Sequence, residues 1–219
     1  MTSTAVNKQD LLARVHDAGY WRIVMHPASF EEHRISSGDA CWQIIRSAQV
    51  TLRGWDYPQL NLHYHEQGDD WIQSGIEYAD HVEFWRFYQS GQFIQHLAVT
   101  SDREPPSLHG PRTESSIING PRQMDFVEAV YTLTEILEFA SRLAYRDVLA
   151  PVANLLIELH GMTGRFLAAS PDRMGFIAST LLRPFQSQVE TIYWRQTVQA
   201  IELIADAPRI AIEAAIHIF

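Results

Sequence analysis

The sequence predicts an α+β protein with a largely antiparallel sheet packed against helices and a mainly helical C-terminal half. Two stretches, residues 71–78 and 81–99, are rich in aromatic and β-branched residues, as strands are. Elsewhere, apolar positions recur at helical spacing. Apolar residues make up 46% of the 219 positions, so the chain can bury a substantial core.

The first sixty residues are predicted to alternate between helix and strand. The predicted helices are residues 5–18 and, beginning at a serine cap, residues 37–48. The predicted strands are residues 21–25 and 49–55. Asp56-Tyr57-Pro58 then favours a turn, because proline cannot continue a strand ladder.

Residues 71–99 are predicted to form a three-stranded antiparallel meander. Ser90-Gly91 is typical of a two-residue hairpin loop, and such a loop pairs Tyr88 with Phe93 and Arg86 with Gln95. Both faces of this hairpin are strongly apolar. We therefore expect a helix to cover one face and another element or a partner to cover the other.

One domain is expected over residues 1–219, with a β-rich part (20–100), a mobile loop (101–121) and a mainly helical part (122–219). The loop contains four prolines, which favour an irregular connection. Pro121 is predicted to begin a helix that runs to about Ala144. Further predicted elements are a strand at 152–160, a turn at 161–164, a return strand at 165–169 and helices at 186–205 and 208–219.

Composition excludes several classes of protein. The formal net charge is −9 and no basic stripe is present, so the chain by itself is a poor candidate for binding the phosphates of a nucleic acid. Cys41 is the single cysteine, which rules out an internal disulfide and fits a reducing, cytoplasmic compartment. No signal peptide, membrane-spanning run or cofactor-binding motif is recognised.

The first candidate site is a binding surface around residues 53–57. Arg53 and Trp55 share a face if this stretch is a strand, and an arginine beside an aromatic ring can bind a carboxylate, a phosphate or a stacked base. The alternative is a structural Arg53–Asp56 pair with Trp55 in the core. The remaining residues assigned to this surface are Asp56, Tyr57 and, from the hairpin, Arg86.

The second candidate is a metal site in the acidic segment that follows. His63 and His65 are two positions apart and can present two imidazoles to one metal ion. Asp69 and Asp70 are the carboxylates assigned to this alternative. The pattern matches no known metalloenzyme motif, and an acidic solvated loop explains the same residues.

Two further features are weaker candidates. His26, before Pro27, could act as a general base or could be a strand-end surface residue. Gly161-Met-Thr-Gly-Arg165 could cradle an anion or could be a plain hairpin turn. Cys41, on an amphipathic stretch, is predicted to be a buried side chain without a catalytic role.

Three segments of the chain resemble an uncharacterised bacterial module that accompanies Schlafen-like DNA- or nucleotide-binding domains. They are Leu52-Arg-Gly-Trp-Asp-Tyr-Pro58, Arg86-Phe-Tyr-Gln-Ser-Gly-Gln-Phe93 and Leu133-Thr-Glu-Ile-Leu-Glu-Phe-Ala-Ser-Arg-Leu143. The resemblance implies an accessory or sensing role, in a bacterial defence or regulatory complex. It transfers no catalytic residue.

The leading functional prediction is a non-enzymatic binding, accessory or sensor subunit without a cofactor. A metal-dependent hydrolase and a nucleic-acid-associated protein are the alternatives. The last helix is apolar almost all round, which predicts a homo-oligomer, or a complex with a protein partner, through the C-terminal helices. The residues assigned to this contact are Ile212, Ile216 and Phe219.

Overall fold

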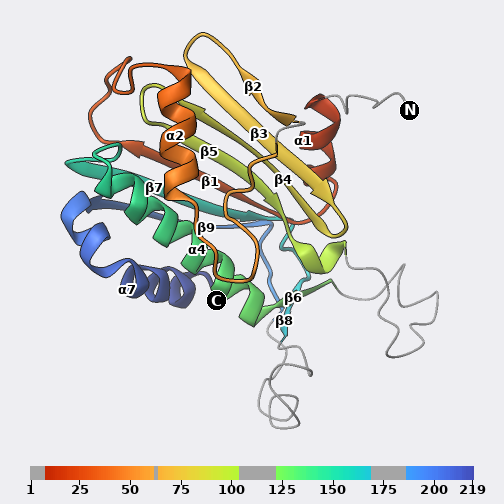
Figure 1. The fold of residues 1–219 in the computed structure, drawn as a ribbon. Coiled ribbons are helices and arrows are strands. Elements are labelled where there is room, and N and C mark those ends of the chain that lie inside the picture. Colours follow the sequence, from red (N-terminus) through yellow and green to blue (C-terminus); the bar gives the residue numbers. More distant parts are fainter. Residues whose placement is uncertain (1–7, 62–63, 104–121, 169–185) are drawn as a thin grey trace, which may run out of the picture.

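The computed structural model describes residues 8–61, 64–103, 122–168 and 186–219, and its main feature is a seven-stranded antiparallel sheet with helices on both faces (Figure 1). The strands are β1 (Tyr20–Pro27), β2 (Glu66–Gln67), β3 (Trp71–Tyr78), β4 (His81–Tyr88), β5 (Phe93–Ala98), β7 (Val152–His160) and β9 (Thr191–Gln199). The helices are α1 (Lys8–His16), α2 (Gly38–Ala48), α4 (Phe126–Tyr145) and α7 (Ala200–Ile218). The α+β prediction is therefore confirmed.

The strand order is β2-β3-β4-β5-β1-β7-β9. The meander β3-β4-β5 forms as predicted. β1 lies between β5 and β7 and pairs with both, so strands from the two halves of the chain belong to one sheet. A separate parallel pair, β6 (Gln123–Asp125) with β8 (Phe166–Ala168), lies beside the start of α4.

Helices cover the two faces of the sheet unequally. α2, α4 and α7 lie along one face, with α4 in the middle (Figure 1). On the other face, α1 packs against β4 and β5, where Leu11 and Val15 contact Val82 and Ala98 in a small second core. The expected two-sided cover of the β4–β5 hairpin is thus present, and both covers come from the chain itself.

The predicted register of this hairpin is wrong by one residue. Phe87, not Tyr88, pairs with Phe93, because the loop has three residues instead of two. The Tyr88 amide donates to the Gln92 carbonyl at 2.9 Å, and Gly91 adopts a φ of +86° inside the loop. Since side chains alternate along a strand, this slip moves Arg86 to the face opposite Gln95.

Two further boundaries differ from the prediction. Residues 49–55 do not form a strand: Val50 makes one isolated bridge to Tyr57, and the residues between them form bends. α4 begins at Phe126 and not at Pro121, because Asp125 caps it and accepts hydrogen bonds from the amides of Val127 and Glu128.

The part from residue 122 onward is less helical than predicted. Residues 191–199 form strand β9, which pairs with β7, where a helix over 186–205 was predicted. β8 does not return along β7 but pairs with β6. The predicted break between helical segments at residues 205 and 208 is confirmed: α7 consists of two helical stretches joined at a kink, where Asp206 has non-helical backbone angles (φ −147°, ψ 39°). Most of the predicted loop 101–121 lies outside the described residues.

The last helix, which the sequence predicts to be apolar almost all round, carries apolar side chains on both its buried and its exposed sides. One side is buried against α4 and β9, whereas Ile212 and Ile216 are exposed and Phe219 is half-buried against Phe126, with ring centroids 6.3 Å apart. None of the helices in the described ranges combines the length and apolarity that crossing a bilayer requires.

Candidate binding site

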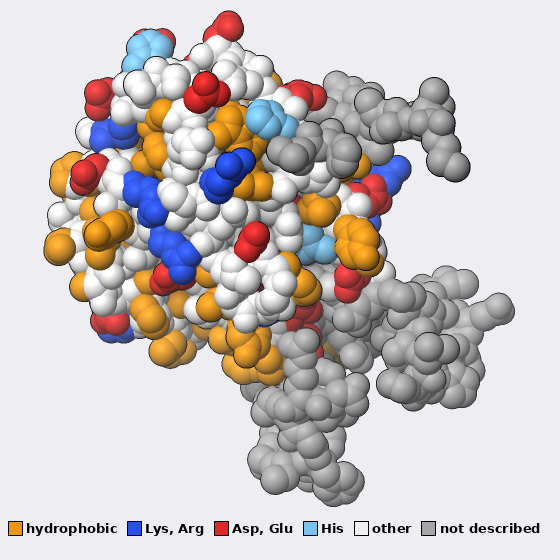
Figure 2. Space-filling model, in the orientation of Figure 1, with side chains coloured by type: hydrophobic (Ala, Val, Ile, Leu, Met, Phe, Trp, Pro, Cys, Tyr) orange, Lys and Arg blue, Asp and Glu red, His pale blue; other side chains and the backbone are white. Residues whose placement is uncertain are grey.

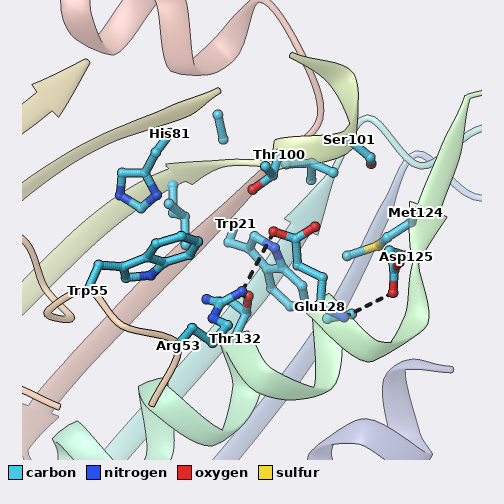
Figure 3. Close-up of a pocket in the computed structure, with 14 residues that line it drawn as sticks. Trp21, Arg53, Trp55, His81, Thr100, Ser101, Met124, Asp125, Glu128 and Thr132 are labelled. Carbon is cyan, nitrogen blue, oxygen red and sulfur yellow. Dashed lines mark hydrogen bonds and ion pairs between the residues drawn. The ribbon is translucent and has the colours of Figure 1, made fainter. Parts of the chain in front are cut away.

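A small pocket opens where the irregular segment 51–57 meets the start of α4 and the end of the sheet (Figure 3). The free space inside it is about 20 Å³, which accommodates one water-sized group. Its polar and aromatic lining residues are Trp21, Arg53, Trp55, His81, Thr100, Ser101, Asp125, Glu128 and Thr132. We call this pocket the Arg53 site.

Arg53 is held in the site by a carboxylate that is completely buried. Its Nε and Nη2 donate to the two oxygens of Glu135 at 3.0 and 2.5 Å, and Glu135 is 0% exposed. Glu128 approaches the same guanidinium at 3.6 Å from the first turn of α4 (Figure 3). Burial raises the pKa of Glu135, although Arg53 opposes the shift.

The predicted Arg53–Asp56 pair is therefore wrong. Asp56 instead accepts a hydrogen bond from the Thr51 hydroxyl at 2.6 Å, within the same segment. Trp55 does not fill the core either: it is 40% exposed, and the Arg53 guanidinium lies 5.2 Å from its ring centroid. Tyr131, 41% exposed, flanks Arg53 at 6.0 Å.

A second buried acid lies on β4. His81 and Glu83 share a face because they are two residues apart on a strand. His81 Nε2 lies 3.0 Å from Glu83 Oε2, and Glu83 also accepts the Gln59 amide at 2.6 Å. Burial lowers the pKa of His81, but the hydrogen bond to Glu83 and its charge outweigh burial, so the net shift is upward.

Tyr57 does not belong to a recognition surface. It is 2% exposed, and its hydroxyl donates to Gln95 deep in the core. Gln95 in turn donates to Glu83 at 3.4 Å, so Tyr57 joins the buried polar network below the site. Burial, together with the charges of Glu83 and Glu135, raises the pKa of Tyr57 well above its usual value.

Arg86 is separated from the other candidate residues by the sheet. It lies on the face opposite Glu83, donates from Nε and Nη2 to Gln73 Oε1 at 3.0 and 2.8 Å, and stacks over Trp71 at 4.5 Å. The structure therefore brings Arg53 and Trp55 together but does not bring Arg86 to them.

The metal alternative gains no geometric support. His63 lies outside the described residues, and the His65 ring packs at a tilt against Trp42, with ring centroids 3.8 Å apart. Asp69 and Asp70 are exposed. In the parts of the chain that the structure describes, no group of three or more His, Cys, Asp or Glu side chains is arranged to hold a metal ion.

The weaker candidates have structural roles. Gly161 and Gly164 form a turn with positive φ, but Arg165 points inward, is 1% exposed and pairs with both oxygens of Asp102 at 2.6 Å. His26 Nδ1 lies 2.8 Å from the carbonyl oxygen of Pro27. Cys41 is buried as predicted, and burial raises its pKa to about 12.

The sequence prediction missed Glu135, Glu128, His81 and Glu83. A signal for three of them was present. Glu135 falls on the buried side of α4, and an acid there requires a partner. His81 and Glu83 have the two-residue spacing that places both on one face of a strand.

No family model, curated protein or solved structure matches the chain. The resemblance to the module that accompanies Schlafen-like domains therefore stays a prediction. The charge around the Arg53 site is the remaining guide to its chemistry. Arg53 already faces the buried carboxylate of Glu135, and His81, which is a cation only when protonated, faces that of Glu83. Glu128 and Asp125 add two further negative charges at the pocket wall, so the arrangement favours a cationic ligand.

Proposed function

We propose that this protein is a non-enzymatic binding subunit that recognises a lysine side chain of a partner protein at the Arg53 site. The observation that carries the proposal is the excess of carboxylates around a pocket of about 20 Å³. A primary ammonium is about the size of a water molecule, whereas a planar guanidinium is larger. The size and charge of the pocket therefore favour lysine over arginine.

The surroundings of the pocket support a protein partner. Leu52, Trp55 and Tyr131 are between 40% and 46% exposed around Arg53. Trp, Tyr and Arg are the residue types that contribute most to binding at protein interfaces. The exposed side chains around Arg53 would pack against the apolar stem of the lysine and against its neighbours, while the Glu128 carboxylate accepts a hydrogen bond from the lysine ammonium. By the resemblance, the partner belongs to a cytoplasmic defence or regulatory complex.

The test uses four fluorescein-labelled peptides of equal length that differ at one central residue: lysine, acetyl-lysine, arginine or glutamate. Leucine and valine flank that residue in all four. Fluorescence anisotropy should show the tightest binding for the lysine peptide. Glu128→Gln keeps the shape of the side chain but removes its charge, so it should weaken lysine-peptide binding roughly 10-fold or more.

The matched control is Glu138→Gln, on the same helix and paired with Arg142 at 2.9 Å, which should leave binding unchanged. Trp55→Ala should weaken all four peptides, since it removes packing area and not charge. Equal affinity for the lysine and acetyl-lysine peptides, or equal effects of the two glutamine substitutions, would refute the proposal.

A further inference from the structure

The flank formed by β9 and α7 carries two features that are unusual for a surface exposed to water. β9 ends the sheet, and its nine residues contain no proline and one charged side chain, Arg195. Native edges are commonly protected by short strands, prolines or charges. The opposite edge follows this rule, because β2 has two residues.

α7 adds an exposed apolar stripe on the same flank. Its exposed members are Ile201 and Ala205 before the kink at Asp206, and Pro208, Ile212 and Ile216 after it. The three isoleucines are 73%, 60% and 76% exposed. Figure 2 shows hydrophobic side chains at the surface on the side where α7 lies in Figure 1.

The two features face the same way because of the layer order. α4 packs against both α2 and α7, α2 contacts β3 near one edge of the sheet, and α7 contacts β9 at the other. Among the described residues, no strand pairs with the outer edge of β9. We call the edge of β9 and the stripe of α7 together the β9–α7 flank.

We propose that the β9–α7 flank is the surface on which a second copy of this chain docks in a two-fold dimer. The stripe is self-complementary when two α7 helices pack antiparallel and cross near Pro208. Ala205 of one copy then lies opposite Ile212 of the other, and Ile201 lies opposite Ile216. Small side chains near the crossing point allow the helices to approach closely, and large ones fill the space on either side.

The size of the flank matches that of a stable dimer. A 19-residue helix is roughly 28 Å long and a nine-residue strand roughly 30 Å. With the helix and sheet layers together roughly 20 Å deep, the footprint is on the order of 600 Å². Two such footprints together amount to roughly 1,200 Å², which is the lower end of the range for specific, stable interfaces, and α7 and the β9 edge are both needed to reach it.

Charges lie at the margin of the stripe and not within it. Arg209 donates to Glu202 at 2.7 Å, to Asp206 at 2.7 Å and to Glu213 at 2.5 Å along one side of α7. This ion cluster would form a polar rim around an apolar centre, which is the usual anatomy of an interface. It also means that docking does not require a charge to be buried.

The dimer is tested by light scattering on the full chain over a concentration series. The wild-type mass should be twice the 25.1 kDa of one chain. Ile212→Asp with Ile216→Asp should weaken dimerisation roughly 100-fold or more, because two central apolar contacts become charged. Tyr78→Asp is the matched control, since Tyr78 is 75% exposed at the opposite side of the sheet, and it should leave the mass unchanged.

A cross-link provides a second measurement in case the aspartate variant fails to fold. Pro208→Cys places a thiol near the two-fold axis, and oxidation should give a covalent dimer, whereas Tyr78→Cys should not. The native Cys41 does not interfere because it is buried. A monomeric wild type at roughly 100 µM, an undiminished dimer in the aspartate variant, or no cross-link from Pro208→Cys would overturn the proposal. Lysine binding at the Arg53 site does not depend on this result.

Discussion

Removing Arg53 should destabilise the protein strongly, because the buried negative charge of Glu135 then has no partner of opposite charge. Arg53→Met keeps much of the side-chain volume but leaves Glu135, 0% exposed, without its two hydrogen bonds of 3.0 and 2.5 Å. Breaking a buried ion pair in this way costs about 3–5 kcal/mol. In a chain of this length, that corresponds to a melting temperature roughly 10 °C lower.

The double variant Arg53→Met/Glu135→Met should recover most of this loss, since an apolar pair of similar volume is often as stable as a buried ion pair. The pH gives a second signature. A carboxyl whose pKa is raised in the folded state binds more protons there than in the unfolded chain, so its contribution to stability falls as pH rises. The pKa of Glu135 is already raised by burial, and losing Arg53 raises it further.

The loss caused by Arg53→Met should therefore be smaller at pH 5 than at pH 8. Urea unfolding followed by tryptophan fluorescence measures both values. The matched control is Arg14→Met, whose ion pair with Glu77 is exposed and should contribute less than about 1 kcal/mol. A loss below about 1 kcal/mol for Arg53→Met, or no recovery in the double variant, would show that the pair does not hold the segment.

The remaining predictions concern two other ionisable groups, His96 and Asp102. Burial and the nearby charges of His16 and Arg22 lower the pKa of His96 to about 4. The folded state therefore favours the neutral ring, so this group stabilises the fold fully above pH 6.5 and loses that contribution as the pH falls toward 4. The difference of about 2.5 between the ordinary and the lowered pKa, discounted for partial exposure, predicts that the free energy of unfolding falls by about 1–2 kcal/mol between pH 7 and pH 4.5. His96→Phe should abolish this pH-dependent fall in urea unfolding. Asp102→Asn should lower stability by about 3 kcal/mol in the same assay, because it removes the charge that faces fully buried Arg165; a loss no larger than that of an exposed pair would contradict this.

Local patterns explain which parts of the fold could be predicted. The β3-β4-β5 meander and α2 with its Ser37 cap follow from residues close together in the sequence. β9 was missed because it leads into α7 without a loop or turn residue, so no local signal separates the strand from the helix at Gln199. The hairpin register depended on a single loop residue, and composition does not fix such a choice.

The pairing of Arg53 with Glu135 lay beyond local patterns, because 82 residues separate the two. Asp56, three positions from Arg53, was the nearer candidate in sequence, but it is used within its own segment by Thr51. The residue that indicates this pairing in the sequence is Glu135. A glutamate on the buried side of α4 must have a cationic or hydrogen-bonding partner, so the helix pattern alone predicts that a distant cation reaches it.

The buried pair also bears on how a binding site can exist on an irregular segment. Residues 51–56 have no strand partners apart from the Val50–Tyr57 bridge, and ordering such a segment on binding would reduce affinity. Arg53 fixes the segment against α4 before any ligand arrives. Because Glu135 neutralises Arg53 from below, the negative charge of Glu128 remains at the pocket wall. A fully buried acid therefore explains both the order of the segment and the preference of the pocket for a cation.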